Sequence, residues 1–211
     1  MARAVAGETA RRRRLARLSL GVLGLSPLLL AAKSTPDPAQ SLAGRYYRQF
    51  PNALVSGEKY VGEDIVEIVP GRTGAAYVRI HLDYYNGHSC TIFGVARAEG
   101  ASLVYRDPSP TYDGRPCTLA VKRVGGSLSI DDGDWTCHTS HCGMRGSLND
   151  VSLPYSSKRP IRYLARLKAS DQYRWALDEW RTGTPMEEQW KKDHPPEPKR
   201  PDCEVSDSCA M

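Results

Sequence analysis

Cysteine is absent from the first 89 residues of this 211-residue chain, and phenylalanine occurs only twice. Because no cysteine precedes Cys90, a lipid-modified N-terminal cysteine is excluded. With so little phenylalanine, the eleven tyrosines and four tryptophans must fill much of the aromatic core. A Gly-x-Ser-x-Gly nucleophile motif is also missing. No catalytic constellation is evident, and we expect a protein that is not an enzyme.

A concentrated basic surface is also lacking beyond the N-terminus, although the whole chain has a formal net charge of +5. Of the 29 basic and 24 acidic residues, residues 1–32 hold six arginines and one glutamate, which leaves 23 of each. Nucleic-acid binding needs a basic face that displaces counterions. The local basic run at 158–168 is typical of a solvated helix face. Nucleic acid is therefore not an expected partner.

The arginine-rich N-terminus lies directly before an uncharged, leucine-rich stretch at residues 18–32. This order is typical of an export signal, and the apolar stretch is short for a transmembrane span. Twin-arginine export and general secretion both remain open, as does an uncleaved anchor. We predict an export signal or N-terminal anchor at 1–32 and a periplasmic or secreted protein. Membrane contact is expected only if this segment stays uncleaved.

The middle of the chain shows the alternation of apolar and polar residues that is typical of strands. Short alternating runs begin near residues 65, 77, 90, 103, 117 and 128, and glycine- or aspartate-rich turns separate them. Asn86-Gly87 is a strong hairpin signal because both residues tolerate a positive φ. We predict a mainly β fold, a small antiparallel meander or calycin-like barrel, because such a sheet must curl to bury one face.

The end of the chain changes to a helical period. Apolar residues between 161 and 167, and again between 173 and 180, predict one or two C-terminal helices that cover the sheet. Ser170 or Asp171 is the expected N-cap where the two apolar stripes fall out of phase. We predict a linker at 33–43, a disulfide-bonded β-domain at 44–181, and a flexible, proline- and charge-rich tail at 182–211.

The six cysteines are expected to form disulfides, because exported proteins meet an oxidising compartment. Six cysteines allow fifteen connectivities, so closeness in sequence and placement on strands are the only guides to the pairing. The predicted pairs are Cys90–Cys117, Cys137–Cys142 and Cys203–Cys209.

Two histidines between two of these cysteines raise a second interpretation. Cys137, His138, His141 and Cys142 are residue types that ligate zinc or copper. Four ligands rarely fit one loop this short, so we favour the disulfide and expect no cofactor. A metal-binding protein stays as an alternative.

Residues 44–150 resemble a group of small exported bacterial β-proteins. The features that carry the resemblance are Gly44-x-Tyr46, Asn86-Gly87-His88-x-Cys90, Gly94-Val95-Ala96, Leu103-Val104-Tyr105, Cys117-Thr118-Leu119 and Cys142-Gly143-x-Arg145-Gly146.

Among studied families, the chain is similar to the periplasmic and membrane-bound inhibitors of C-type lysozyme. These calycin-like barrels place a Ser-Gly-x-x-Tyr loop in the lysozyme cleft, and Ser56-Gly57-Glu58-Lys59-Tyr60 matches that pattern. The resemblance implies that Ser56, Gly57 and Tyr60 contact a protein partner such as lysozyme. We therefore predict a non-enzymatic binding or inhibitor module of the bacterial envelope. The other alternative is a small-ligand carrier that uses the barrel interior.

Overall fold

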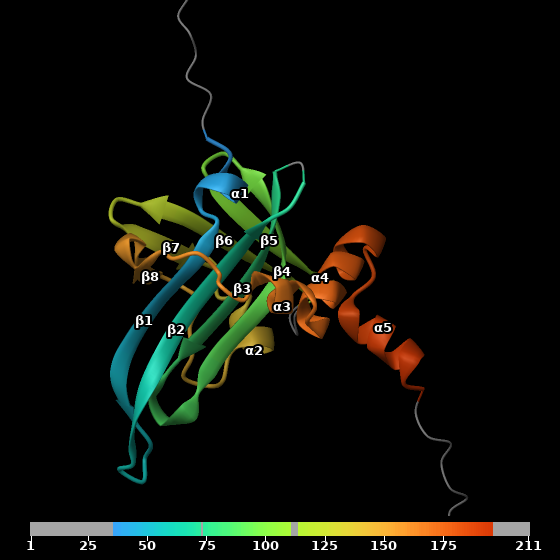
Figure 1. The fold of residues 1–211 in the computed structure, drawn as a ribbon. Helices are drawn as coiled ribbons and strands as arrows, with labels where there is room; N and C mark the ends of the chain where they lie inside the picture. Colours follow the sequence, from blue (N-terminus) through green and yellow to red (C-terminus); the bar gives the residue numbers. More distant parts are fainter. Residues whose placement is uncertain (1–35, 73, 111–113, 196–211) are drawn as a thin grey trace, which may run out of the picture. The chain divides into compact units, whose positions relative to one another are not determined.

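Eight antiparallel strands dominate the structure, a computed structural model that describes residues 36–72, 74–110 and 114–195 (Figure 1). Each strand pairs with its neighbours in the sequence, in the order β1 to β8. The predicted antiparallel meander barrel is confirmed. The strands are β1 Gly44–Ala53, β2 Lys59–Pro70, β3 Ala75–Asp83, β4 Ser89–Glu99, β5 Ser102–Pro110, β6 Pro116–Val124, β7 Ser127–Asp131 and β8 Val151–Pro154.

Short helices flank the strands. They are α1 Pro38–Ser41, α2 His138–His141, α3 Leu164–Lys168, α4 Asp171–Thr182 and α5 Met186–Asp193, with the 3₁₀ turns η1 Tyr85–Gly87 and η2 Tyr155–Ser157. The predicted N-cap at Ser170 is confirmed, since its hydroxyl accepts a hydrogen bond from the Tyr173 N–H at 3.3 Å. Helix α5 lies within the segment predicted as the tail, and α1 lies within the segment predicted as the linker.

The hairpin between β3 and β4 forms where the Asn-Gly pair predicts it. Asn86 has a φ of 62° and Gly87 a φ of 71°, the left-handed values that such a turn requires. The Tyr84 N–H donates to the His88 carbonyl oxygen at 2.7 Å and closes the turn. This turn fixes the register that sets Val78, Ile80 and Leu82 on the inner face of the sheet.

The inner faces of all eight strands share one hydrophobic core. Side chains from β1 through β8 pack together there. Ala39, in α1, and Leu42, directly after α1, are buried among them. The interior of the barrel is therefore filled by side chains. Its fully buried larger side chains include Tyr46, Ile68, Ile80, Leu82, Leu103, Leu119, Leu128, Ile130 and Leu153.

The outer face of β2 to β4 carries a second, smaller core under the C-terminal helices. Tyr77 on β3 packs against Tyr173 of α4, with ring centroids 4.7 Å apart, and Leu167 of α3 is buried beside them. Ala176 of α4 completes the buried set. The helices thus cover this face of the sheet, as expected.

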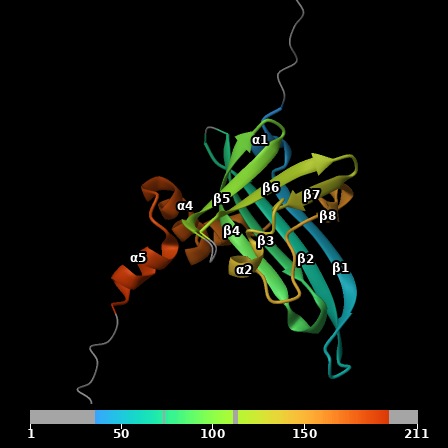
Figure 2. The same ribbon diagram turned by 180° about the vertical axis from the view of Figure 1, so that it is seen from behind.

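The barrel wall has two places where the strand ladder is incomplete. Between β4 and β5 it covers only three residue pairs, from Arg97–Val104 to Glu99–Ser102. Between β1 and β8 no ladder is formed by the described residues. A single bridge, Arg45–Arg159, lies at this seam. The barrel is thus nearly closed, and Figure 2 shows β5 to β8 from the opposite side.

Strands β1 and β8 are not among the runs that the alternation of the sequence predicted, and β1 is the longer of the two. Only Tyr46 is buried along it, while Arg45 and Arg48 form ion pairs with acids of β2. The strand forms because its backbone pairs with β2 over ten residues, not because its side chains alternate.

No helix within 36–72, 74–110 and 114–195 is long and apolar enough to cross a membrane. The predicted export signal or anchor at 1–32 lies outside these residues.

A buried carboxylate in the turn after β7 leads to a prediction about pH. Burial raises the pKa of Asp132, and the charges of Asp131 and Asp134 raise it further. A raised pKa in the folded state favours folding below the unfolded pKa, and that contribution is lost as the pH rises. We expect Asp132→Asn to raise the melting temperature at pH 7 by about 3 °C, for about 1 kcal/mol of relieved desolvation.

The check is calorimetry of both proteins between pH 3 and pH 8. The advantage of Asp132→Asn should disappear at about pH 4 and below, where the unfolded aspartate is protonated as well. Glu58→Gln, which neutralises an exposed acid in the hairpin between β1 and β2, serves as the control. An advantage that stays constant with pH would show that charge is not its cause.

Candidate functional site

The predicted Ser-Gly-x-x-Tyr loop joins β1 to β2 at one end of the barrel (Figure 1). Ser56 and Gly57 are exposed at the tip of this hairpin. Tyr60 lies on β2, where its hydroxyl donates to the Tyr84 carbonyl at 3.2 Å and accepts from the Gly87 N–H at 3.1 Å. The structure thus places Ser56 and Gly57 on the surface, while the Tyr60 hydroxyl links their hairpin to the hairpin between β3 and β4.

A second contact joins the same two hairpins. The Val55 N–H donates to Oδ1 of Asn86 at 2.9 Å. A third loop reaches them from α2, since the Gly143 N–H donates to the Ser89 carbonyl at 2.8 Å and the Arg145 guanidinium lies 5.9 Å from the Tyr85 ring centroid. We call residues 54–60, 84–88 and 143–147 the loop end.

The loop end exposes several large apolar side chains. Val55 is 69% exposed, Tyr85 47% and Met144 85%. The exposed charges around them include Lys59 and Arg145 together with Glu58. Apolar side chains that gather on a surface held by hydrogen bonds are typical of a protein-binding site.

The disulfides differ from the predicted pairs. Cys90 pairs with Cys142 and Cys117 with Cys137, so the predictions of Cys90–Cys117 and Cys137–Cys142 are wrong. Cys137 and Cys142 flank the single turn of α2, and each bridges to a different strand. The Cys90–Cys142 disulfide therefore links the end of α2 to β4, and the Cys117–Cys137 disulfide links its start to β6. Cys203 and Cys209 lie outside the described residues.

This pairing bears on the proposed metal ligands. The sulfurs of Cys137 and Cys142 are both oxidised and are not thiolate ligands. His138 lies beside the Trp135 ring, with centroids 6.0 Å apart, while Nε2 of His141 is 2.8 Å from Oδ2 of Asp107. The described residues hold no group of three side chains suited to a metal ion.

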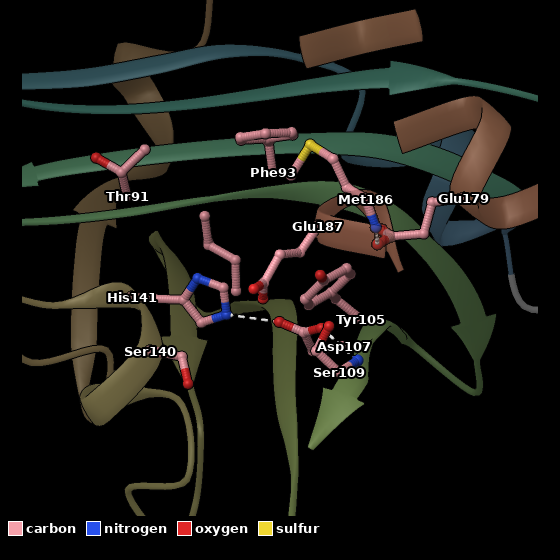
Figure 3. Close-up of a pocket in the computed structure, with 11 residues that line it drawn as sticks. Thr91, Phe93, Tyr105, Asp107, Ser109, Ser140, His141, Glu179, Met186 and Glu187 are labelled. Carbon is pink, nitrogen blue, oxygen red and sulfur yellow. Dashed lines mark hydrogen bonds and ion pairs between the residues drawn. The ribbon is translucent and has the colours of Figure 1, made fainter. Parts of the chain in front are cut away.

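His141 instead lines a cavity of about 370 Å³ in the gap between β4 and β5 (Figure 3). Phe93 of β4 faces Tyr105 and Asp107 of β5 across it, and Glu179 of α4 closes one side. The cavity lies in the barrel wall, while the barrel interior that the carrier alternative needs is filled by the core.

The sequence analysis did not identify this cavity. Among the lining residues it named His141 as a candidate metal ligand and Tyr105 only as part of a motif that carries the resemblance. The lining residues come from strands, a one-turn helix and two C-terminal helices that lie far apart in the sequence. No spacing pattern connects them.

Glycine at position 94 gives the Tyr105 ring its place in the wall. A Cβ atom at Gly94 would lie 2.1 Å from Cε2 of Tyr105, so no other residue fits under this ring. Tyr105 is 6% exposed, and burial together with the nearby charges of Asp107 and Glu179 raises its pKa. Its hydroxyl therefore stays protonated.

The comparisons with known proteins identify no relative. No family model, no curated protein and no solved structure matches this chain. The structure itself shows an eight-stranded, nearly closed antiparallel barrel with two disulfides. The disulfides indicate an oxidising compartment outside the cytoplasm.

Proposed function

We propose that the protein is a non-enzymatic binding module of the bacterial periplasm or exterior that grips a protein partner with its loop end. The observation that carries this proposal is that the loops of the loop end are fastened to one another while their apolar side chains stay exposed. Tyr60 and Asn86 hold two hairpins together, and the Cys90–Cys142 disulfide holds the third loop. Loops fixed before binding lose little entropy when a partner docks.

The partner that we propose is a C-type lysozyme, and the protein is then its inhibitor. Ser56 and Gly57 are exposed at the tip of the β1–β2 hairpin, where they can enter a cleft. Glycosidases carry a pair of carboxyl groups at the cleavage site. The Ser56 hydroxyl is a donor for such a carboxylate, and Lys59 and Arg145 add positive charge near the tip.

Inhibition of lysozyme by the loop-end variants tests the proposal. We expect Ser56→Ala to raise the inhibition constant about tenfold, the effect of one lost hydrogen bond to a charged group. Tyr60→Phe should weaken inhibition as well, because it removes the two hydrogen bonds of the Tyr60 hydroxyl that help to fasten the hairpin, while its ring stays in place. The measurement is the initial rate of cell-wall lysis at increasing inhibitor concentration.

The matched control is Ser156→Ala, an exposed serine in η2 near the turn at Gly126 and away from the loop end. It should leave the inhibition constant within twofold of the wild-type value. Wild-type protein that does not slow lysozyme at high micromolar concentration would end the proposal of this partner. If Ser56→Ala and Ser156→Ala weakened inhibition equally, the interface with lysozyme would not lie at the loop end.

A further inference from the structure

The cavity between β4 and β5 carries an inference that is independent of the loop end. Its volume of about 370 Å³ lies in the range of small-molecule pockets, about 300–1,000 Å³. Such pockets combine apolar walls with a few polar groups that fix the ligand. Phe93 and Met186 supply apolar walls here, from β4 and α5 (Figure 3).

The hydroxyl of Tyr105 is the most informative group in the cavity. The residue is more than nine-tenths buried, and its hydroxyl points into the cavity (Figure 3). No other described residue forms a hydrogen bond with this hydroxyl. The hydroxyl is thus open to the cavity, while the rest of the side chain is held in the barrel wall. A ligand in the cavity would supply the missing partner.

The remaining polar groups beside Tyr105 are mainly acceptors. Glu179 accepts one hydrogen bond through Oε1, from the Met186 N–H at 3.0 Å, and this leaves Oε2 available. Asp107 accepts from the Ser109 N–H at 2.8 Å and pairs with Nε2 of His141. In its neutral form, a histidine that donates through Nε2 carries an acceptor at Nδ1. These groups call for a ligand that donates hydrogen bonds.

The charges around the cavity indicate the sign of the charge that the ligand would carry. No lysine or arginine lines the cavity among the described residues. Burial raises the pKa of Glu179, the negative charge of Asp107 raises it further, and His141 opposes this effect. At the mouth, Glu187 is 71% exposed and bonds to Lys191 at 2.7 Å, so it is already paired. The acids inside, Asp107 and Glu179, form no ion pair with a lysine or arginine among the described residues.

We propose that this cavity binds one organic cation, an ammonium or guanidinium group on a short apolar chain. Glu179 and Asp107 pair with its charge, the Tyr105 hydroxyl accepts one of its hydrogen bonds, and Phe93 packs against its chain. Cations favour the faces of aromatic rings, which adds to the charge pairing. The cation comes either from a free amine or from a lysine or arginine side chain of a protein.

Calorimetric titration of the full, oxidised chain with a matched series of probes tests this. n-Butylammonium and n-butylguanidinium represent the free cations, and the Nα-acetyl amides of lysine and arginine represent side chains. n-Butanol and butyrate have a similar size without the positive charge. We expect saturable binding of the cations in the millimolar range or tighter. Butanol should bind at least about tenfold more weakly, because it carries no positive charge that could pair with the acids. Butyrate should not bind measurably, because it is itself an anion.

Variants at the cavity give the second arm. Glu179→Gln should weaken cation binding about tenfold, and Tyr105→Phe several-fold, while the Phe ring still fits against Gly94. The control is Asp178→Asn, the neighbouring acid of α4, which pairs with Arg181 and does not line the cavity. It should change binding less than twofold.

The outcomes separate clearly. Binding of butyrate or butanol as tightly as butylammonium overturns the proposal, and so does the absence of saturable binding for all four cations. Equal effects of Glu179→Gln and Asp178→Asn would also overturn it.

If Glu179→Gln does not fold, Tyr105→Phe and the probe series on the wild-type protein still decide. Tighter binding of the acetylated amino-acid amides would identify a protein side chain as the source. Ser56→Ala should leave cation binding unchanged, so this result stands apart from that of lysozyme inhibition.

Discussion

Replacing Cys90 and Cys142 together with alanine is expected to lower the melting temperature by about 10 °C or more. This disulfide closes a loop across 52 residues. In the chain-entropy account, a crosslink over that length destabilises the unfolded chain by about 4 kcal/mol. Each kcal/mol corresponds to about 2–4 °C in a domain of this size. The bridge also joins β4 to the loop that follows α2, so its loss frees the third part of the loop end.

The second disulfide provides an internal comparison. Cys117–Cys137 closes a loop across only 20 residues, for which the same account gives about 3 kcal/mol. Its double alanine variant should therefore melt above the Cys90/Cys142 variant and below the wild type. Cys203→Ala/Cys209→Ala is expected to change the melting temperature little, because its loop would be short and lies in a charged, proline-rich segment.

Scanning calorimetry under oxidising conditions measures all three variants. Mass spectrometry of non-reduced peptides checks the pairing first, since Cys90–Cys142 and Cys117–Cys137 give peptides that the originally predicted pairs do not. If the Cys203/Cys209 variant lost as much stability as the Cys90/Cys142 variant, the C-terminal segment would have to pack on the domain.

Alternation in the sequence predicts strands well where one face of the strand is buried. Val78, Ile80 and Leu82 all point into the core, so β3 is visible in the sequence, and the Asn-Gly turn fixes its hairpin with β4. Strand β1 has only one buried side chain, Tyr46. Its formation depends on backbone pairing and on ion pairs with β2, which leave no periodic signal.

The pairing of the cysteines depends on tertiary structure in the same way. Cys90 and Cys117 do face the core, as their strands predict, but they lie on β4 and β6 with β5 between them in the sheet order. The short α2 brings Cys137 to one of them and Cys142 to the other. Closeness along the chain was therefore a misleading guide to these two bridges.

The two candidate sites also differ in how much of them a sequence can reveal. Ser56, Gly57 and Tyr60 are neighbours in one hairpin, so a local motif could identify them. Tyr105 and Glu179 are brought together only when α4 docks beside the gap between β4 and β5. Such a site has no signature before the fold is known.

Removing the positive partner of the most deeply buried acid is the other change with a large expected effect. Glu67 on β2 is fully buried, with Oε2 3.0 Å from Nε of Arg79 and Oε1 3.4 Å from Nη1 of Arg45. Tyr163, directly before α3, donates its hydroxyl to the same carboxylate. The network thus fastens the start of the C-terminal helices to the outer face of the barrel.

We expect Arg79→Met to destabilise the protein by about 3 kcal/mol, because it leaves a buried charge without its closest cation. Methionine keeps much of the length of the arginine chain, so lost packing contributes little. The control is Arg106→Met, whose partner Glu99 forms an exposed ion pair that contributes at most about 1 kcal/mol. Urea unfolding followed by tryptophan fluorescence gives both free energies.

A double variant then separates charge from packing. In Glu67→Gln/Arg79→Met the buried group is neutral, so most of the lost stability should return relative to Arg79→Met alone. If the double variant is as unstable as the single one, the Arg79 side chain acts by packing and not by balancing the charge. If Arg79→Met costs no more than Arg106→Met, then Arg45 and the Tyr163 hydroxyl suffice to hold the carboxylate, and the ion pair with Arg79 is dispensable to the fold.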